Sequence, residues 1–186
     1  MRIVSGIYGG RKLQVPDGRD IRPTSDKVRS AVFNMLQARN AISGSYVLDG
    51  FCGTGALGFE ALSRGADHCS FFDMSRVSLS LAQENAQILS AQDQCSFFSK
   101  DITKIGARGE AQQAFDLVFL DPPYHKSLVP VAMQRLAEQG WLSDQAWVVC
   151  ETEKNAHIPS VTGFECDSEK TYGQIYITLF QYTQMP

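Results

Sequence analysis

Four residues at the end of an apolar stretch, Asp121-Pro122-Pro123-Tyr124, have the types and spacing to hold an aromatic amine. They follow Phe115–Leu120, a run of strand length that only Asp116 interrupts, which predicts a buried central strand. Proline has no N–H and disfavours the helical conformation in the residue before it. Asp121 and Pro122 are therefore expected to be extended, with carbonyl oxygens that no helix uses.

This turn would present a carboxylate, free carbonyl oxygens and a tyrosine ring in one place. An amine on a flat ring needs acceptors for its two N–H groups and a ring to stack on. The motif therefore predicts catalytic and base-binding roles for Asp121, Pro122, Pro123 and Tyr124. The structural alternative is a strand end with a proline stop and a buried tyrosine.

A glycine-rich loop forms the second candidate site. Gly53-Thr54-Gly55-Ala56-Leu57-Gly58 fits the pattern G-x-G-x-x-G, follows an apolar run ending at Asp49 and opens a helix. Asp73 lies 20 residues after Gly53. These features alone are also typical of a nicotinamide-dinucleotide site.

Acidic residues favour a different cofactor. Asp49 directly precedes the glycine loop, where it would repel a pyrophosphate and attract an amino group. S-adenosylmethionine fits better, with its ammonium at Asp49, its ribose hydroxyls at Asp73 and its adenine amine at Asp101. Four successive strands would end on or just before an Asp, at the edge where parallel sheets bind ligands. Each acid taken alone could instead be a helix cap or a surface charge.

Alternating strand and helix patterns over residues 46–151 predict a parallel sheet with helices on both faces. The chain has room for one α/β domain, over about 41–186, and for no separate substrate domain. Five strands of the sheet and an antiparallel C-terminal pair are expected at 46–49, 68–72, 95–99, 116–120 and 146–151, and at 163–169 and 174–181.

Residues 1–40 are predicted to form an extension. Two extended segments, 2–5 and 11–15, flank Gly9-Gly10 and indicate a hairpin. A helix should start near Pro23, capped by Thr24 or Ser25. Its expected apolar stripe consists of Val28, Ala31, Val32, Met35 and Leu36, and the residues placed off it are Lys27, Arg29 and Asn34.

Charge is distributed unevenly along the chain. The 186 residues carry a net charge of −3, but the first 40 contain eight Lys/Arg against three acids. This asymmetry predicts a basic face on an acidic body, suited to binding phosphates. The alternative is an ordinary solvated surface.

Membrane and metal sites are not expected. No apolar run approaches the roughly 20 residues that span a bilayer, and the N-terminus lacks the apolar core of a signal peptide. Five scattered cysteines and three isolated histidines form no metal-binding motif. We therefore expect free thiols and a cytoplasmic location.

Two further motifs point to a family. D-x-F-x-G-x-G at Asp49–Gly55, together with D-P-P-Y at Asp121–Tyr124, resembles class I S-adenosylmethionine-dependent amino-methyltransferases. R-I-V-S-G-x-Y-G-G-R-K-L at Arg2–Leu13 and R-P-T-S-D-K-V-R at Arg22–Arg29 resemble the bacterial 16S ribosomal RNA guanine-N2 methyltransferases of the RsmD type. The resemblance covers nearly the whole chain.

The resemblance implies a Rossmann-like, mostly parallel seven-stranded sheet and methyl transfer to the N2 amine of one guanine in 16S ribosomal RNA, guanine 966 in the family. It implies a monomer acting without metal, on naked RNA or a partly assembled small subunit. Implied cofactor contacts are Arg22, Thr24, Asp49, Phe51, Cys52, Gly53, Gly55, Asp73, Met74, Asp101, Ile102 and Asp121. Implied RNA contacts are Arg2, Arg11, Lys12, Arg22 and Lys126. The alternatives are an adenine-N6 methyltransferase acting on DNA or RNA, which can share D-P-P-Y, and a non-catalytic RNA-binding assembly factor.

Overall fold

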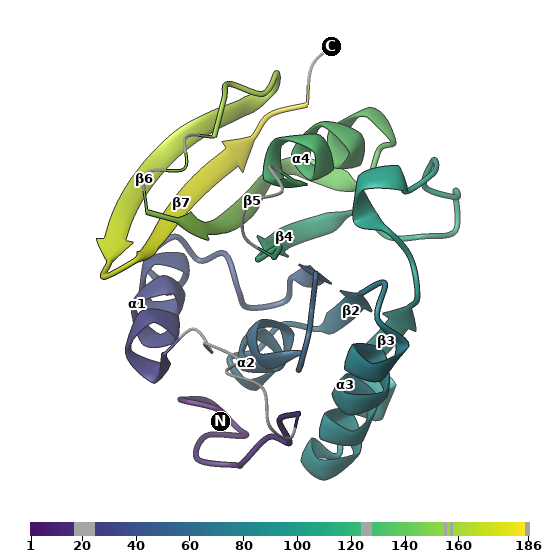
Figure 1. The fold of residues 1–186 in the computed structure, drawn as a ribbon. Helices are drawn as coiled ribbons and strands as arrows, with labels where there is room; N and C mark the ends of the chain where they lie inside the picture. Colours follow the sequence, from purple (N-terminus) through teal and green to yellow (C-terminus); the bar gives the residue numbers. More distant parts are fainter. Residues whose placement is uncertain (17–24, 124–127, 155, 157, 185–186) are drawn as a thin grey trace.

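The computed structural model describes residues 1–16, 25–123, 128–154, 156 and 158–184. Its centre is a seven-stranded sheet in the order β3-β2-β1-β4-β5-β7-β6 (Figure 1). The strands are β1 (Tyr46–Gly50), β2 (His68–Phe72), β3 (Cys95–Phe98), β4 (Phe115–Leu120), β5 (Leu142–Glu153), β6 (Phe164–Tyr172) and β7 (Ile175–Tyr182). The first five are parallel, and β7 pairs antiparallel with both β5 and β6.

Helices cover both faces of this sheet. The α-helices are α1 (Asp26–Gln37), α2 (Ala56–Ser63), α3 (Arg76–Leu89) and α4 (Leu128–Glu138), with short 3-10 turns η1 (Gln92–Gln94) and η2 (Ile102–Lys104). In Figure 1, α1, α2 and α3 lie on one side of the sheet and α4 on the other. The alternation of strand and helix predicted from the sequence is confirmed.

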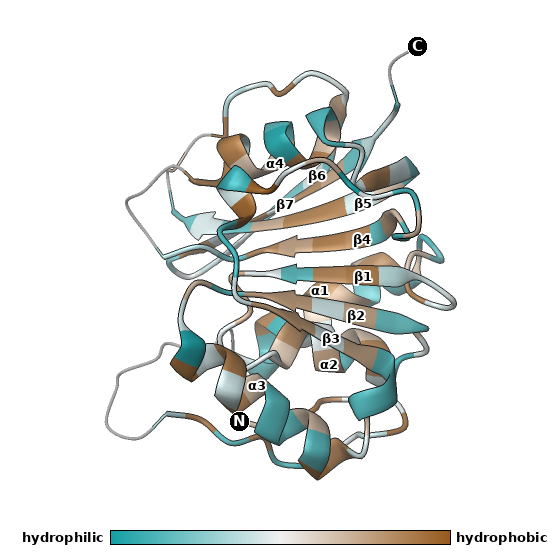
Figure 2. Ribbon diagram, turned by 90° about the vertical axis from the view of Figure 1, so that its right-hand side faces the viewer, coloured by the Kyte–Doolittle hydropathy of each residue, from teal (hydrophilic) through white to brown (hydrophobic). Residues whose placement is uncertain are grey.

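Alternate residues of each strand point to opposite cores. On β4, Leu117 and Phe119 join a core with α1, α2 and α3, whereas Val118 and Leu120 join a core with α4. The apolar colouring of β4 and β5 in Figure 2 reflects this burial on both faces. A strand buried on both sides is rigid, and its end is a fixed platform for the residues that follow.

Helix α1 begins as predicted and buries more than predicted. Ser25 is its N-cap, with the side-chain oxygen 3.3 Å from Val28 N. Val28, Val32 and Leu36 are buried, but so are Phe33 and Arg29, whose side chain is 1% exposed. The placement of Arg29 off the buried stripe was wrong, because its guanidinium lies among buried acceptors.

The N-terminal segment is tied to α2. The predicted hairpin is reduced to one antiparallel bridge between Arg2 and Lys12, with Ile3 N 3.0 Å from Arg11 O. The Glu60 carboxylate of α2 accepts hydrogen bonds from Val4 N at 2.7 Å and Ser5 N at 3.1 Å. Ile3, Tyr8 and Leu13 belong to the same core as α1 and α2. The segment therefore packs as part of the sheet's covering layer.

Strand β5 starts at Leu142, four residues before the predicted start. Residues 143–145 are polar, so the apolar pattern did not indicate that they belong to the strand. Gln145 also has a positive φ of +65°. The register between β4 and β5 shifts between Phe115 and Leu117. Among the described residues, no helix is long and apolar enough to span a membrane.

Candidate active site

The register of the parallel strands brings the predicted acids to one edge. Gly50 pairs with Phe72 on one side and with Leu120 on the other. Asp73 and Asp121, which directly follow those two residues, therefore flank the loop that leaves β1. Asp49 lies one residue before the end of β1. The strands therefore bring these three acids to the same edge of the sheet, as the sequence pattern predicted.

The glycine loop has the conformation that only small residues adopt freely. Gly53 has φ +53° and Gly55 has φ +77°. A Cβ on Gly55 would lie 2.5 Å from the Phe59 ring, so glycine is required for packing there. A Cβ on Gly53 would meet nothing within 4 Å, which leaves open space over the backbone. Phe51, half-buried, also has a positive φ of +64°.

Asp49 is buried beneath this loop. Its side chain accepts a hydrogen bond from Gly58 N at 2.9 Å, and the residue is 2% exposed. Burial raises the pKa of Asp49 to about 8, against the lowering effect of the Gly58 hydrogen bond, and the charge of Asp73 raises it further. A cationic group brought beside Asp49 would stabilise its charged form.

Asp73 shapes the loop directly. One carboxylate oxygen accepts from Gly53 N at 3.0 Å, and the other accepts from Ser75 N at 2.8 Å. Met74 beside it is 70% exposed. Cys52 is buried, with its backbone N 3.0 Å from Phe72 O. A carboxylate and an exposed apolar side chain thus lie at the open side of the glycine loop.

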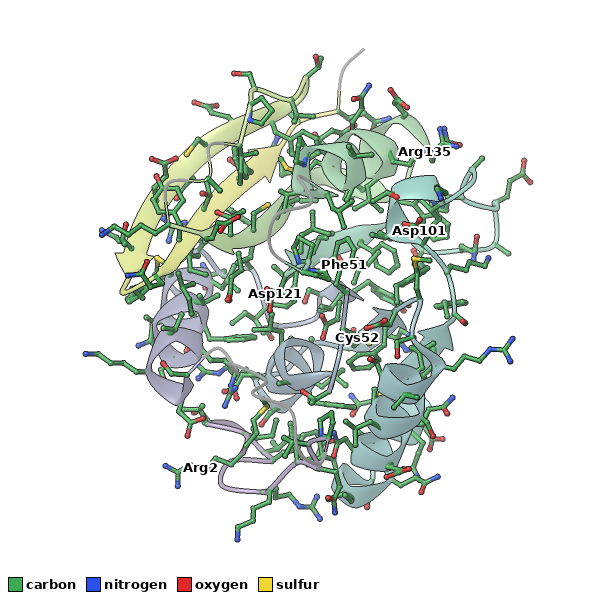
Figure 3. The ribbon with its side chains drawn as sticks, viewed as in Figure 1. Arg2, Phe51, Cys52, Asp101, Asp121 and Arg135 are labelled. Atoms are coloured by element: carbon green, nitrogen blue, oxygen red, sulfur yellow. The ribbon has the colours of Figure 1, made fainter. Side chains whose placement is uncertain are left out.

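Asp101 caps η2. It accepts from Thr103 N at 3.0 Å and from the Thr103 hydroxyl at 2.6 Å, and Lys104 Nζ lies 3.5 Å away. The hydrogen bond from the Thr103 hydroxyl lowers the pKa of Asp101 most, and the bond from Thr103 N and the nearby Lys104 lower it further below its ordinary value. The neighbouring Ile102 is buried in the α4-side core. In Figure 3, Asp101 lies to the right of Asp121, Phe51 and Cys52, which gather near the centre.

Asp121 directly follows β4 and is half-buried, and it is followed by a buried Pro122 and an exposed Pro123. Burial raises the pKa of Asp121 well above its ordinary value, and the negative charges of Glu151 and Asp49 raise it further. A raised pKa makes this carboxyl a better proton acceptor once it is ionised. The predictions for Tyr124, Arg22, Thr24 and Lys126 concern residues outside the described ones.

Glu151 was not predicted as a site residue. Cys150 pairs with Leu120, so Glu151 stands level with Asp121 on the adjacent strand, and it is 5% exposed. The sequence signal was present, because the strand predicted at 146–151 ends on Glu151 just as the others end near an acid. The apolar residues before Glu151 indicated a strand with only a structural role.

Three of the predicted RNA-binding cations, Arg2, Arg11 and Lys12, lie on the N-terminal segment. Arg2 Nε is 3.1 Å from Asp26 Oδ2, Arg11 Nη1 donates to Leu89 O at 2.9 Å, and Lys12 is exposed. Arg2 lies well below Asp121 in the view of Figure 3. In that view Arg2 is separated from Asp121, which lies at the edge that carries the acids.

The residues at the carboxyl edge fit S-adenosylmethionine chemically. Asp49 offers a buried carboxyl group whose charged form a cation would stabilise, Gly53 an uncovered backbone, and Asp73 a carboxylate beside the exposed Met74. Among the described residues there is no group of three His, Cys, Asp or Glu that could hold a metal ion.

Comparison with solved structures defines the class. The chain is 33% identical to yhhF from Escherichia coli, with a TM-score of 0.85 over 100% of this chain and 99% of that one. It is 34% identical to HI0767 from Haemophilus influenzae, with a TM-score of 0.81 and 98% of each chain covered. It also shares its fold with the magnesium protoporphyrin IX methyltransferase of Synechocystis, at a TM-score of 0.67 and 20% identity over 90% and 87% of the two chains. The fold is that of the class I S-adenosylmethionine-dependent methyltransferases.

Sequence comparison narrows the class to a family. The family model described as Conserved hypothetical protein 95 matches residues 1–181. Ribosomal RNA small subunit methyltransferase D of Haemophilus influenzae is 36% identical, with 97% of this chain and 93% of that protein covered. The Escherichia coli K12 protein of the same name is 35% identical over 97% and 89%. The chain belongs to this methyltransferase family, as its motifs indicated.

Proposed function

We propose that the protein transfers a methyl group from S-adenosylmethionine to the exocyclic N2 amine of one guanine in 16S ribosomal RNA. Family membership supports the ribosomal RNA substrate, because relatives covering almost the whole chain are named for it. The observation that carries the chemistry is the position of Asp121-Pro122 beside the glycine loop, set by the pairing of Gly50 with Leu120.

Asp121 and Pro122 would orient the amine. A guanine amine is a weak nucleophile because its lone pair is delocalised into the ring. The Asp121 carboxylate and the Pro122 carbonyl oxygen would each accept one of its two hydrogens. This holds the nitrogen with its lone pair directed at the methyl carbon. Tyr124 is proposed to stack on the base once it has left its RNA context.

Asp121 would also stabilise the charge that develops. The amine nitrogen becomes positive as it bonds to the methyl carbon, so a fixed carboxylate stabilises the transition state more than the ground state. The amine then loses a proton, and the raised pKa of Asp121 suits this carboxylate to accept it. The cofactor supplies an activated methyl group on a sulfonium.

The glycine loop and the other acids would hold that cofactor. Asp49 would bind the methionine ammonium, Asp73 the ribose hydroxyls and Asp101 the adenine amine. Phe51, Cys52, Gly53, Gly55, Met74 and Ile102 would form the surrounding contacts, with Arg22 and Thr24 near the carboxylate. Residues 1–40 are proposed to bind RNA phosphates through Arg2, Arg11, Lys12 and Arg22, assisted by Lys126. The proposed substrate is 16S ribosomal RNA, naked or in a partly assembled small subunit.

The test is Asp121→Ala in single-turnover methyl transfer to 16S ribosomal RNA. We expect unchanged cofactor binding and a transfer rate lower by on the order of 10²–10³-fold, as for loss of one preorganised charge-stabilising group. Asp93→Ala is the matched control, because Asp93 is exposed and precedes β3 at the opposite edge of the sheet. A near-normal rate in Asp121→Ala would refute this role. Mass spectrometry of ribosomal RNA from cells with and without the protein identifies the modified base.

A further inference from the structure

We propose that Glu151 is a specificity-determining residue that accepts a hydrogen bond from N1–H of the target guanine. This inference rests on the proposed function and assigns the neighbouring strand a part in it. It explains why an acid stands next to Asp121, and it offers a physical basis for choosing guanine over adenine.

The position of Glu151 follows from the sheet. Leu120 pairs with Cys150, and neighbouring strands lie about 4.8 Å apart. Asp121, directly after β4, and Glu151, still within β5, therefore lie at the same level of the sheet. Val149 and Phe119, two residues earlier on each strand, both belong to the core on the side of α1. By the two-residue period of strands, Glu151 and Asp121 point to that same side.

The two carboxyl groups influence one another electrically. Glu151 raises the pKa of Asp121, with an effect second only to burial. The charge of Glu151 therefore opposes the ionisation of Asp121. N–H donors of a base bound at this edge would stabilise the charged form of each carboxyl group that they contact.

Guanine offers the matching donors. Its N1–H and one hydrogen of the N2 amine point along the same edge of the base, and the second amine hydrogen points to the N3 side. If Asp121 and Pro122 take the amine hydrogens, Glu151 is the next acceptor across the sheet and suits N1–H. Adenine carries lone pairs on the ring nitrogens beside its amine, and a carboxylate at Glu151 would repel them.

The experiment compares two bases in two enzymes. 16S ribosomal RNA is ligated from synthetic fragments with guanosine or 2-aminopurine riboside at the mapped target. 2-Aminopurine keeps the 2-amino group but has a lone pair at N1. We expect wild type to favour guanine in kcat/KM. In Glu151→Gln, whose amide can accept from N1–H or donate to the N1 lone pair, we expect the guanine/2-aminopurine ratio to fall on the order of 10- to 100-fold.

The controls separate this inference from the proposed function. Glu165→Gln removes an exposed carboxylate near the start of β6, level with Trp147 of β5 by way of Gln181, and should leave the ratio unchanged. Failure of wild type to methylate the guanine substrate would refute the proposed function itself. An active wild type with an unchanged ratio in Glu151→Gln, or an equal loss on both bases, would overturn only the role of Glu151.

If Glu151→Gln does not fold, a second measurement on the wild-type protein tests for an acceptor at N1–H. The affinity of the wild-type protein for the guanine RNA is then compared with its affinity for the 2-aminopurine RNA. Both are measured in the presence of the cofactor that has lost its methyl group. Weaker binding of the 2-aminopurine RNA supports an acceptor at N1–H, and equal binding contradicts it.

Discussion

Two buried carboxylates, Glu60 on α2 and Asp49 on β1, show how differently one fold treats the same chemical group. Glu60 is fully buried and accepts from Val4 N, Ser5 N and Arg64 Nε, the last at 2.8 Å, with Arg29 Nε 3.6 Å away. Asp49 is almost as buried but accepts from Gly58 N, and its pKa is raised to about 8.

The difference separates structural acids from acids that fit a ligand. Glu60 is surrounded by two cations and two amides that join the N-terminal segment to α1 and α2. Asp49 and Asp121 lie at the carboxyl edge, where burial and their acidic neighbours oppose ionisation. Strongly perturbed carboxyls at one edge are typical of functional sites, which sacrifice stability for binding.

Replacing Glu60 should give the largest loss of stability. In Glu60→Ala the Arg29 guanidinium remains buried and two backbone N–H groups lose their acceptor. We expect the free energy of unfolding, measured by urea denaturation, to fall by about 3–5 kcal/mol. Glu84→Ala, an exposed position on α3, is the control and should change little. A decrease below about 1 kcal/mol would mean that Glu60 is not a structural anchor.

Asp49→Asn should have the opposite effect on stability. The folded pKa of Asp49, about 8, lies above its ordinary value of 3.8, so its favourable contribution is complete below about pH 4 and is lost as pH rises toward 8. The Asn oxygen can still accept from Gly58 N. The variant should therefore gain stability relative to wild type across this range, by up to about 1.4 kcal/mol per pH unit.

Cofactor affinity completes this test. Without the carboxylate, calorimetry should show weaker binding of S-adenosylmethionine by Asp49→Asn at pH 8. Asp93→Asn is the control for both measurements. Higher stability combined with intact cofactor affinity would contradict the assignment of Asp49 to the ammonium.

The sequence predicted the carboxyl edge better than the Glu60 anchor, for a physical reason. Asp49, Asp73 and Asp121 each lie at the carboxyl end of a strand that local pattern predicts, and the carboxyl ends of parallel strands meet at one edge of the sheet. Glu60 and its partners at residues 4 and 5 are far apart in the sequence, so no local pattern connects them. Arg29 was placed on the solvent side because charge normally marks exposure, and only the tertiary partners of Arg29 reverse that rule.

Glu151 and the start of β5 were missed for a related reason. Glu151 follows a run of apolar residues whose burial already explained the strand, and its proximity to Asp121 depends on which strands are neighbours. Ser143, Asp144 and Gln145 interrupt the apolar pattern at the other end of β5. The Ser143 hydroxyl is 2.7 Å from Asp116 Oδ1, a partner on β4 that the sequence alone does not identify.

The smallest expected effect concerns the cations that the Glu60 anchor holds in place. If the N-terminal segment binds RNA phosphates, replacing Arg2, Arg11 and Lys12 with Gln should reduce the slope of log affinity against log salt by about 1 for each phosphate that is no longer neutralised. Lys12→Gln alone should reduce this slope more than Arg2→Gln alone, because Arg2 is already paired with Asp26 at 3.1 Å. Lys170→Gln, exposed on β6, is the control. An unchanged slope in the triple variant would mean that RNA phosphates do not bind to this segment. Glu60 would then anchor an element that has only a structural role.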